Sequence, residues 1–66
     1  MALNTMSDRE LVDRYNAMNR TLRSYHTQGY IGHLVYRMGD VKRELQGREV
    51  QVRHVGVNAD LEIVGK

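Results

Sequence analysis

Two stripes of apolar residues, separated by a glycine, constrain the fold of this 66-residue chain more than any other feature. In each stripe the spacing alternates between three and four residues, which places the side chains along one face of a helix. The first stripe contains Leu11, Tyr15, Met18, Leu22 and Tyr25, and the second contains Ile31, Leu34, Met38, Val41 and Leu45. Because the second stripe restarts out of phase beyond Gly29, the sequence predicts two helices folded back on each other.

The first helix is predicted over residues 8–27, beginning at a capping box. In the segment Ser7-Asp8-Arg9-Glu10, we expect the Ser7 hydroxyl to accept from the Glu10 N–H and the Glu10 carboxylate to accept from the Ser7 N–H. Met6 and Leu11 flank this box at the spacing of a hydrophobic staple. Residues 1–6 carry no periodic pattern and are expected to be loose, apart from Leu3, which we expect to rest on the two-helix hairpin.

The connection between the helices is predicted at Thr27-Gln28-Gly29. Gly29 suits the left-handed backbone conformation with which many helices end. So short a connection makes the two helices antiparallel neighbours. The second helix is predicted over residues 30–46, stopping at Gly47.

The last third of the chain changes from a helical to a β period. Valines alternate with polar residues from Val50 to Val57, but the phase slips by one at His54, which predicts a bulge or a bend there. Asn58-Ala59-Asp60 has the chemistry of a turn. The pattern predicts a β-hairpin with strands at 49–57 and 61–65. Because an isolated hairpin is only marginally stable, it must pack on the helices or on another chain.

The predicted architecture is therefore α+β, an antiparallel two-helix hairpin followed by a C-terminal β-hairpin in one small domain. We expect two copies to associate through the helices, because so short a chain buries only about 60% of its unfolded surface. There is no cysteine, hence no disulfide and no cysteine-bound zinc. No apolar run approaches the roughly 20 residues of a membrane span, and no secretory signal is recognisable, so we expect a cytoplasmic protein without membrane association.

Patterns typical of catalysis are absent from the sequence. There is no cysteine nucleophile, glycine-rich phosphate loop, H-E-x-x-H pair or glycine-flanked serine. Asp40 and Glu44 lie one helical turn apart, as two carboxylates sharing a proton might. We expect both instead to be solvated and to lie near arginines, Asp40 opposite Arg43 and Arg37 and Glu44 near Arg48. The chain is predicted not to be an enzyme.

The three histidines, His26, His33 and His54, are the candidates for metal binding. His26 and His33 fall on either side of the predicted helix break, so no single helix presents both at the spacing of one turn. Zinc sites need three or four ligands, and the sequence supplies no such set. We expect ordinary surface histidines, no metal and no cofactor, with a pH-sensitive interface as the alternative.

The outer face of the second helix is the most informative candidate binding surface. Gly32, Tyr36, Gly39 and Arg43 follow steps of four, three and four, which places them opposite the apolar stripe. Two glycines inside a helix cost about 1 kcal/mol each relative to alanine, while Tyr and Arg are enriched at binding hot spots. The pattern predicts contact with a partner protein, first of all a second copy. The alternative is an ordinary exposed face with Tyr36 lying over its neighbours.

Arginines suggest a second kind of partner. The net charge is only +2, but residues 14–53 hold eight basic side chains against three acidic ones. The outer stripe of the first helix is predicted to contain Arg9, Asp13, Asn16, Arg20, Arg23 and Thr27. The candidate phosphate-binding residues are Arg20, Arg23, Arg37, Arg43 and Arg48. A solvated surface with ion pairs would have the same composition, and no known nucleic-acid recognition module matches.

The function predicted from these features is a small, non-enzymatic protein-binding module. It would act as an inhibitor or adaptor, of the kind that phages encode, by occupying a surface of a larger protein. The alternative is a small basic nucleic-acid-binding protein that uses an arginine-rich helical face. The two differ in salt dependence, because binding to phosphates weakens steeply as salt rises.

Overall fold

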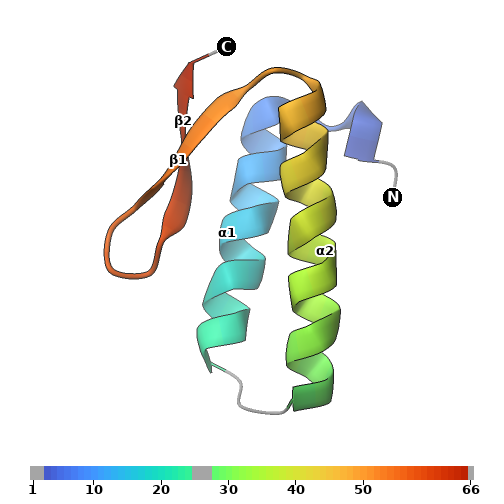
Figure 1. Cartoon of the computed structure of the whole chain (residues 1–66), viewed down its shortest axis with the longest axis vertical. Helices are drawn as coiled ribbons and strands as arrows, with labels where there is room; N and C mark the ends of the chain where they lie inside the picture. The colour runs from blue at the N-terminus through green and yellow to red at the C-terminus, as the bar shows by residue number, and fades with distance from the viewer. Residues whose placement is uncertain (1–2, 25–27, 66) are drawn as a thin grey trace.

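The computed structural model describes the backbone of residues 3–24 and 28–65 and the side chains of residues 3–24 and 32–65. Its elements are η1 (Leu3–Thr5), α1 (Asp8–Ser24), α2 (Gln28–Gly47), β1 (Gln51–Val55) and β2 (Asp60–Gly65). The two helices lie side by side and antiparallel, and the hairpin of β1 and β2 lies on the other side of α1 (Figure 1). The predicted α+β architecture is confirmed.

α1 begins at the predicted capping box. The Ser7 hydroxyl accepts a hydrogen bond from the Glu10 N–H at 3.1 Å, and Glu10 Oε1 accepts one from the Ser7 N–H at 2.9 Å. Met6 and Leu11 are buried in the same apolar cluster, as a hydrophobic staple requires. Leu3–Thr5 form a short 3-10 helix that contacts α2, so this segment is not loose, and Leu3 packs against the core as expected.

The helix boundaries at the connection differ from the prediction. α1 is helical to Ser24, and the rest of its predicted range, residues 25–27, lies outside the described residues. α2 already begins at Gln28, so Gly29 lies in its first turn and does not terminate α1. The first four N–H groups of a helix have no acceptor within the helix. The stability of the first turn therefore depends less on the helix propensity of each residue than that of the helix interior does, and a glycine is tolerated there.

α2 ends at Gly47 as predicted, and a Schellman motif closes it. Glu49 has a left-handed backbone with a φ of 61°. Its N–H donates to the Gln46 carbonyl at 3.0 Å, and the Val50 N–H donates to the Leu45 carbonyl at 3.1 Å. The side chains of Val50 and Leu45 are both buried, which is the apolar contact that accompanies this motif.

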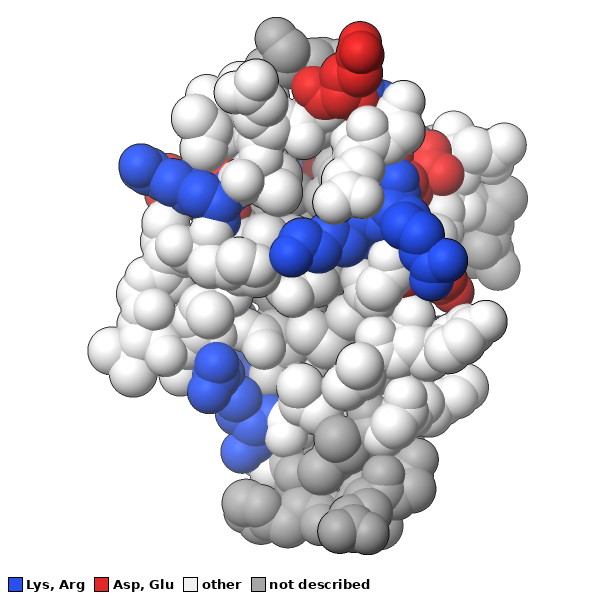
Figure 2. Space-filling model, viewed as in Figure 1, with Lys and Arg blue, Asp and Glu red and all other residues white. Residues whose placement is uncertain are grey.

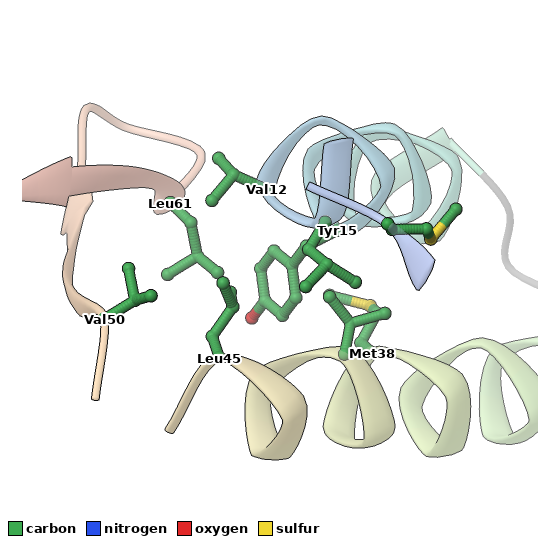
Figure 3. Close-up of a cluster of buried hydrophobic side chains, with 9 residues drawn as sticks. Val12, Tyr15, Met38, Leu45, Val50 and Leu61 are labelled. Carbon is green, nitrogen blue, oxygen red and sulfur yellow. The ribbon is translucent and has the colours of Figure 1, made fainter. Parts of the chain in front are cut away.

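The apolar core lies between α1 and α2 and continues under the hairpin. Its buried residues are Met6, Leu11, Val12, Tyr15, Met38, Val41, Leu45, Val50 and Leu61. In Figure 3, Val50 and Leu61 reach from the hairpin toward Leu45, and Tyr15 lies between the two helices. Both predicted stripes supply this core, although Tyr25 and the side chain of Ile31 lie outside the described part of the chain.

The first strand of the hairpin is shorter than predicted, the second begins one residue earlier, and the turn also starts earlier. The turn occupies residues 56–59, and the Ala59 N–H donates to the Gly56 carbonyl at 3.2 Å. Gly56 and Ala59 have φ values of 77° and 57°, which lie in the left-handed region. Val57, predicted to end the first strand, is instead 98% exposed in this turn.

The predicted bulge at His54 is wrong. His54 pairs in register with Leu61, and the register shifts only between Gln51 and Val52. Val52 and Val55 are three residues apart on β1, so their side chains point to opposite faces of the hairpin. The valine pattern that suggested a slip therefore reflects two partly buried faces of a regular strand.

Two asparagines of α1, which we call the asparagine clasp, fasten the hairpin to this helix. Asn16 Nδ2 donates to the Leu61 carbonyl at 3.0 Å, and Asn16 Oδ1 accepts from the Leu61 N–H at 2.7 Å. The side-chain amide thus makes the two backbone hydrogen bonds that a neighbouring strand would make with Leu61. Asn19, which is 5% exposed, donates through Nδ2 to the Asn58 carbonyl at 2.7 Å and to Asp60 Oδ1 at 3.0 Å.

The predicted outer stripe of the first helix is therefore partly covered by the hairpin. Besides Asn16, Arg23 Nε donates to the Asn58 carbonyl at 3.0 Å, and Arg20 lies 3.9 Å from Asp60. This face was expected to be exposed because its residues are polar. Asn16 is partly buried and its hydrogen bonds are satisfied, but a polar side chain adds nothing to an apolar pattern, so the periodic pattern missed the contact.

The clasp predicts a specific stability loss for Asn16→Asp. Aspartate keeps the shape of the side chain but removes the donor to the Leu61 carbonyl and places a negative charge beside that oxygen. We expect the free energy of unfolding to fall by about 1–3 kcal/mol in urea titrations. Asn4→Asp, which adds the same charge at an exposed site in η1, serves as the control. Equal effects of the two substitutions would contradict the clasp.

The capping box predicts a pH dependence of stability. The hydrogen bond from the Ser7 N–H, with smaller contributions from the Ser7 side chain and the Arg14 charge, holds the pKa of Glu10 below its ordinary value of 4.5. A carboxyl with a lowered folded-state pKa stabilises the fold above its unfolded-state pKa, and this contribution is lost as pH falls through the folded-state pKa.

Glu10→Gln should therefore be less stable than the wild type at neutral pH. The difference should shrink below pH 4.5 and disappear once Glu10 is protonated in the folded chain. Urea unfolding of both proteins across this pH range measures it. A difference that stayed constant down to acid pH would show that the charge of Glu10 does not contribute.

Candidate functional site

The predicted binding stripe lies on the side of α2 that faces away from α1. The helix places Gly32, Tyr36, Gly39 and Arg43 on one side, which we call the α2 outer stripe, opposite the buried apolar residues. The Tyr36 side chain is 70% exposed. A Cβ atom at Gly32 would meet open space, and one at Gly39 would lie 3.8 Å from an Arg43 guanidinium nitrogen.

Exposed apolar surface continues beside this stripe. Val35, which the sequence analysis did not single out, is 53% exposed next to Tyr36. Its position one residue from the stripe is the only sequence evidence that could have found it. In Figure 1 the hairpin packs on α1, on the side away from α2, so it does not cover the outer stripe.

Two hollows flank the contact between α1 and α2. The larger, of about 360 Å³, borders the outer stripe through Val35 and Gly39 and has Tyr15, Leu22 and Met38 among its lining residues. The smaller, of about 180 Å³, is lined by Leu3, Arg14, Met18, Arg37, Asp40 and Val41. The larger hollow therefore extends the apolar surface of the outer stripe toward α1.

Both acidic residues of α2 pair with arginines, as predicted for Arg43 and Arg48, but Asp40 forms no ion pair with Arg37 among the described residues. Arg43 Nη2 donates to Asp40 Oδ1 at 3.0 Å, at the exposed end of the outer stripe. Arg48 Nε donates to Glu44 Oε2 at 3.0 Å. Each carboxylate is thus paired with an arginine that lies about one helical turn further along the chain.

Arg48 connects three elements. Besides Glu44 it donates to Asp8 Oδ1 at the start of α1 and to the Leu3 carbonyl in η1, each at 3.0 Å. Its side chain is only 19% exposed. The hydrogen bonds to Asp8 and then to Glu44 raise the pKa of the Arg48 guanidinium above its ordinary range. Arg48 was predicted to bind phosphate, but the structure places it in this internal network.

The predicted phosphate-binding arginines do not form one basic surface. Arg20 and Arg23 lie against the hairpin, Arg43 pairs with Asp40, and Arg48 is partly buried. Arg37 has no acidic side chain at ion-pair distance among the described residues. Figure 2 shows basic side chains in separate groups, with acidic ones beside the upper groups and broad uncharged areas between them.

His54 links the hairpin to α2. Its Nδ1 lies 2.8 Å from the Ala59 carbonyl and its Nε2 lies 3.2 Å from Lys42 Nζ. Because a carbonyl only accepts, Nδ1 carries the hydrogen and Nε2 accepts from the Lys42 ammonium. His33 is exposed, and His26 lies outside the described residues. In the described ranges, no three His, Asp or Glu side chains are grouped as a metal ion would require.

Comparison of the chain with protein-family models, curated proteins and solved structures found no match. Within the described ranges, neither helix combines the length and apolar character that crossing a bilayer requires.

The Arg48 network predicts unequal effects of two arginine substitutions. Arg48→Gln removes hydrogen bonds that join η1, α1 and α2, so the urea midpoint of unfolding should fall clearly. Arg53→Gln is the control, because Arg53 forms an exposed ion pair with Glu62 at 2.8 Å and such pairs contribute about 0–1 kcal/mol. Equal midpoints for the two variants would contradict a structural role for Arg48.

Proposed function

We propose that this protein is a small, non-enzymatic binding module that acts as an inhibitor or adaptor by covering a surface of a larger protein. The observation that carries the proposal is the exposure of Tyr36 and Val35 between Gly32 and Gly39 on α2. An aromatic side chain beside bare backbone is an arrangement suited to close protein contact. Large Tyr side chains frequently dominate the binding energy of interfaces.

The two glycines support contact rather than simple exposure. Each lowers the intrinsic stability of α2 by about 1 kcal/mol relative to alanine. Gly32 has open space around its Cβ position, so nothing inside the chain requires a glycine there. A partner backbone that approaches α2 closely would require it, because any side chain at Gly32 or Gly39 would stand in the way.

A second copy of the chain fits the same surface. If two α2 helices cross antiparallel about a two-fold axis, one register places Tyr36 of each copy opposite Gly39 of the other. The same register places Arg43 of each copy opposite Gly32 of the other. Each large side chain then meets a glycine, which is the self-complementarity that a two-fold interface needs. We expect this dimer in the absence of a target, with the two partners competing for one surface.

The nucleic-acid alternative has less support. Its arginines are paired, turned toward the hairpin or separated by uncharged surface, as described above. A chain that contacts several phosphates needs a continuous basic face. Salt dependence separates the two functions, because contacts made by Tyr36 and the glycines do not depend on counterion release.

Gly39→Leu tests the proposal. We expect tenfold or greater weakening of self-association, since leucine would occupy the space predicted for the partner's Tyr36. Sedimentation equilibrium at two salt concentrations measures the association, and circular dichroism checks that helix content is kept. Gly47→Leu, which adds the same side chain at the open end of α2, is the matched control.

Three outcomes would contradict the proposal. Unchanged association of Gly39→Leu would exclude the outer stripe as the contact, and a wild type that remains monomeric at about 1 mM would exclude the second copy. Binding to a short DNA duplex that disappears between low and high salt would favour the arginines instead.

A further inference from the structure

The smaller hollow between the helices combines an apolar floor with basic walls. Val41, which is 2% exposed, forms part of this floor together with the partly buried Leu3 and Met18. Arg14 from α1 and Arg37 from α2 line the hollow from its two sides. Apolar surface bordered by two guanidinium groups is complementary to a ligand that carries an apolar group and an anion together.

The charges around the hollow favour an anion. Asp40 also lines it, but its carboxylate accepts a hydrogen bond from Arg43 at 3.0 Å, so its charge is balanced. Among the described residues no acidic group lies at ion-pair distance from Arg37. Arg14 lies near enough to Glu10 for its charge to help lower the pKa of that carboxyl. Arg37 is therefore the main anion-binding group of the hollow.

We infer that this hollow binds the C-terminal residue of another polypeptide, with its apolar side chain on the floor and its free α-carboxylate at Arg37 and Arg14. The hollow has a volume of about 180 Å³. It is smaller than the roughly 300–1,000 Å³ of sites for drug-sized ligands and cofactors.

The small size also explains why a chain terminus is the occupant. In a C-terminal residue the apolar side chain and the carboxylate leave the same Cα atom, so one residue reaches both the floor and the basic walls. An internal acidic residue presents its carboxylate without an adjacent apolar group on the same side chain. It would need a second residue, and the hollow has little room for two.

This site is separate from the α2 outer stripe. Arg37 and Val41 lie on the flank of α2 opposite to the one that carries Val35 and Lys42. The inference therefore does not rest on the proposed function. Loss of one activity is expected to leave the other unchanged.

Titration with N-acetyl-L-leucine, followed by NMR of the ¹⁵N-labelled full chain, tests the inference. This probe carries one apolar side chain and one free carboxylate, while N-acetyl-L-leucinamide lacks only the carboxylate and acetate lacks the apolar group. We expect saturable shifts at the lining residues for N-acetyl-L-leucine, with a Kd on the order of 1 mM for so small a ligand. The other two compounds should bind at least tenfold more weakly.

Arg37→Gln should weaken binding of N-acetyl-L-leucine at least tenfold. Arg53→Gln, which removes an exposed arginine of the hairpin, should leave it unchanged. Wild-type-like spectra away from the hollow check that both variants are folded. Gly39→Leu should bind the probe normally, so failure of this inference is distinguishable from failure of the outer stripe.

Several results would overturn the inference. Equal binding of the amide would show that the carboxylate is not recognised, and equal binding of acetate would reduce the hollow to a general anion site. Absence of saturable shifts at millimolar probe, or retained binding in Arg37→Gln, would exclude the site.

Discussion

Burial of two faces of α1 is the constraint on which the rest of the structure depends. One face, which includes the fully buried Leu11, packs on α2, and the other, which includes Val12, packs on β2. A helix pair or a two-stranded hairpin alone buries too little apolar surface to be stable. α1 therefore becomes the middle layer, and α2 is left with its outer side uncovered. The surface proposed for binding is a consequence of this arrangement.

Much of the helical part could be predicted because its determinants are local. The capping box needs only Ser7 and Glu10, three residues apart, and the apolar stripes need only regular spacing. The second face of α1 could not be predicted in this way. Asn16 and Asn19 contribute to it through hydrogen bonds to residues about 40 positions away, and a polar residue gives no hydropathy signal for burial.

The same holds for the candidate sites, where features set by local spacing could be predicted and features set by distant contacts could not. Helical spacing alone places Gly32, Tyr36, Gly39 and Arg43 on one side of α2. Which arginines are available for a ligand depends on contacts between distant segments. Arg48, for example, is held by Asp8, 40 residues earlier in the chain, while Arg37 is left without such a partner among the described residues. The sequence shows the arginines but not their partners.

The asparagine clasp also has a consequence for aggregation. In an antiparallel pair, unpaired N–H and C=O groups along an outer edge can template the addition of another chain. Asn16 satisfies both outward groups of Leu61, so the outer edge of β2 is blocked near its start. The Lys42 ammonium contacts the His54 side chain of β1 and so brings a charge close to this strand, of the kind that discourages strand addition. Release of the hairpin from α1 would remove the block on β2, so the contact that stabilises the fold also protects the chain from edge-to-edge growth.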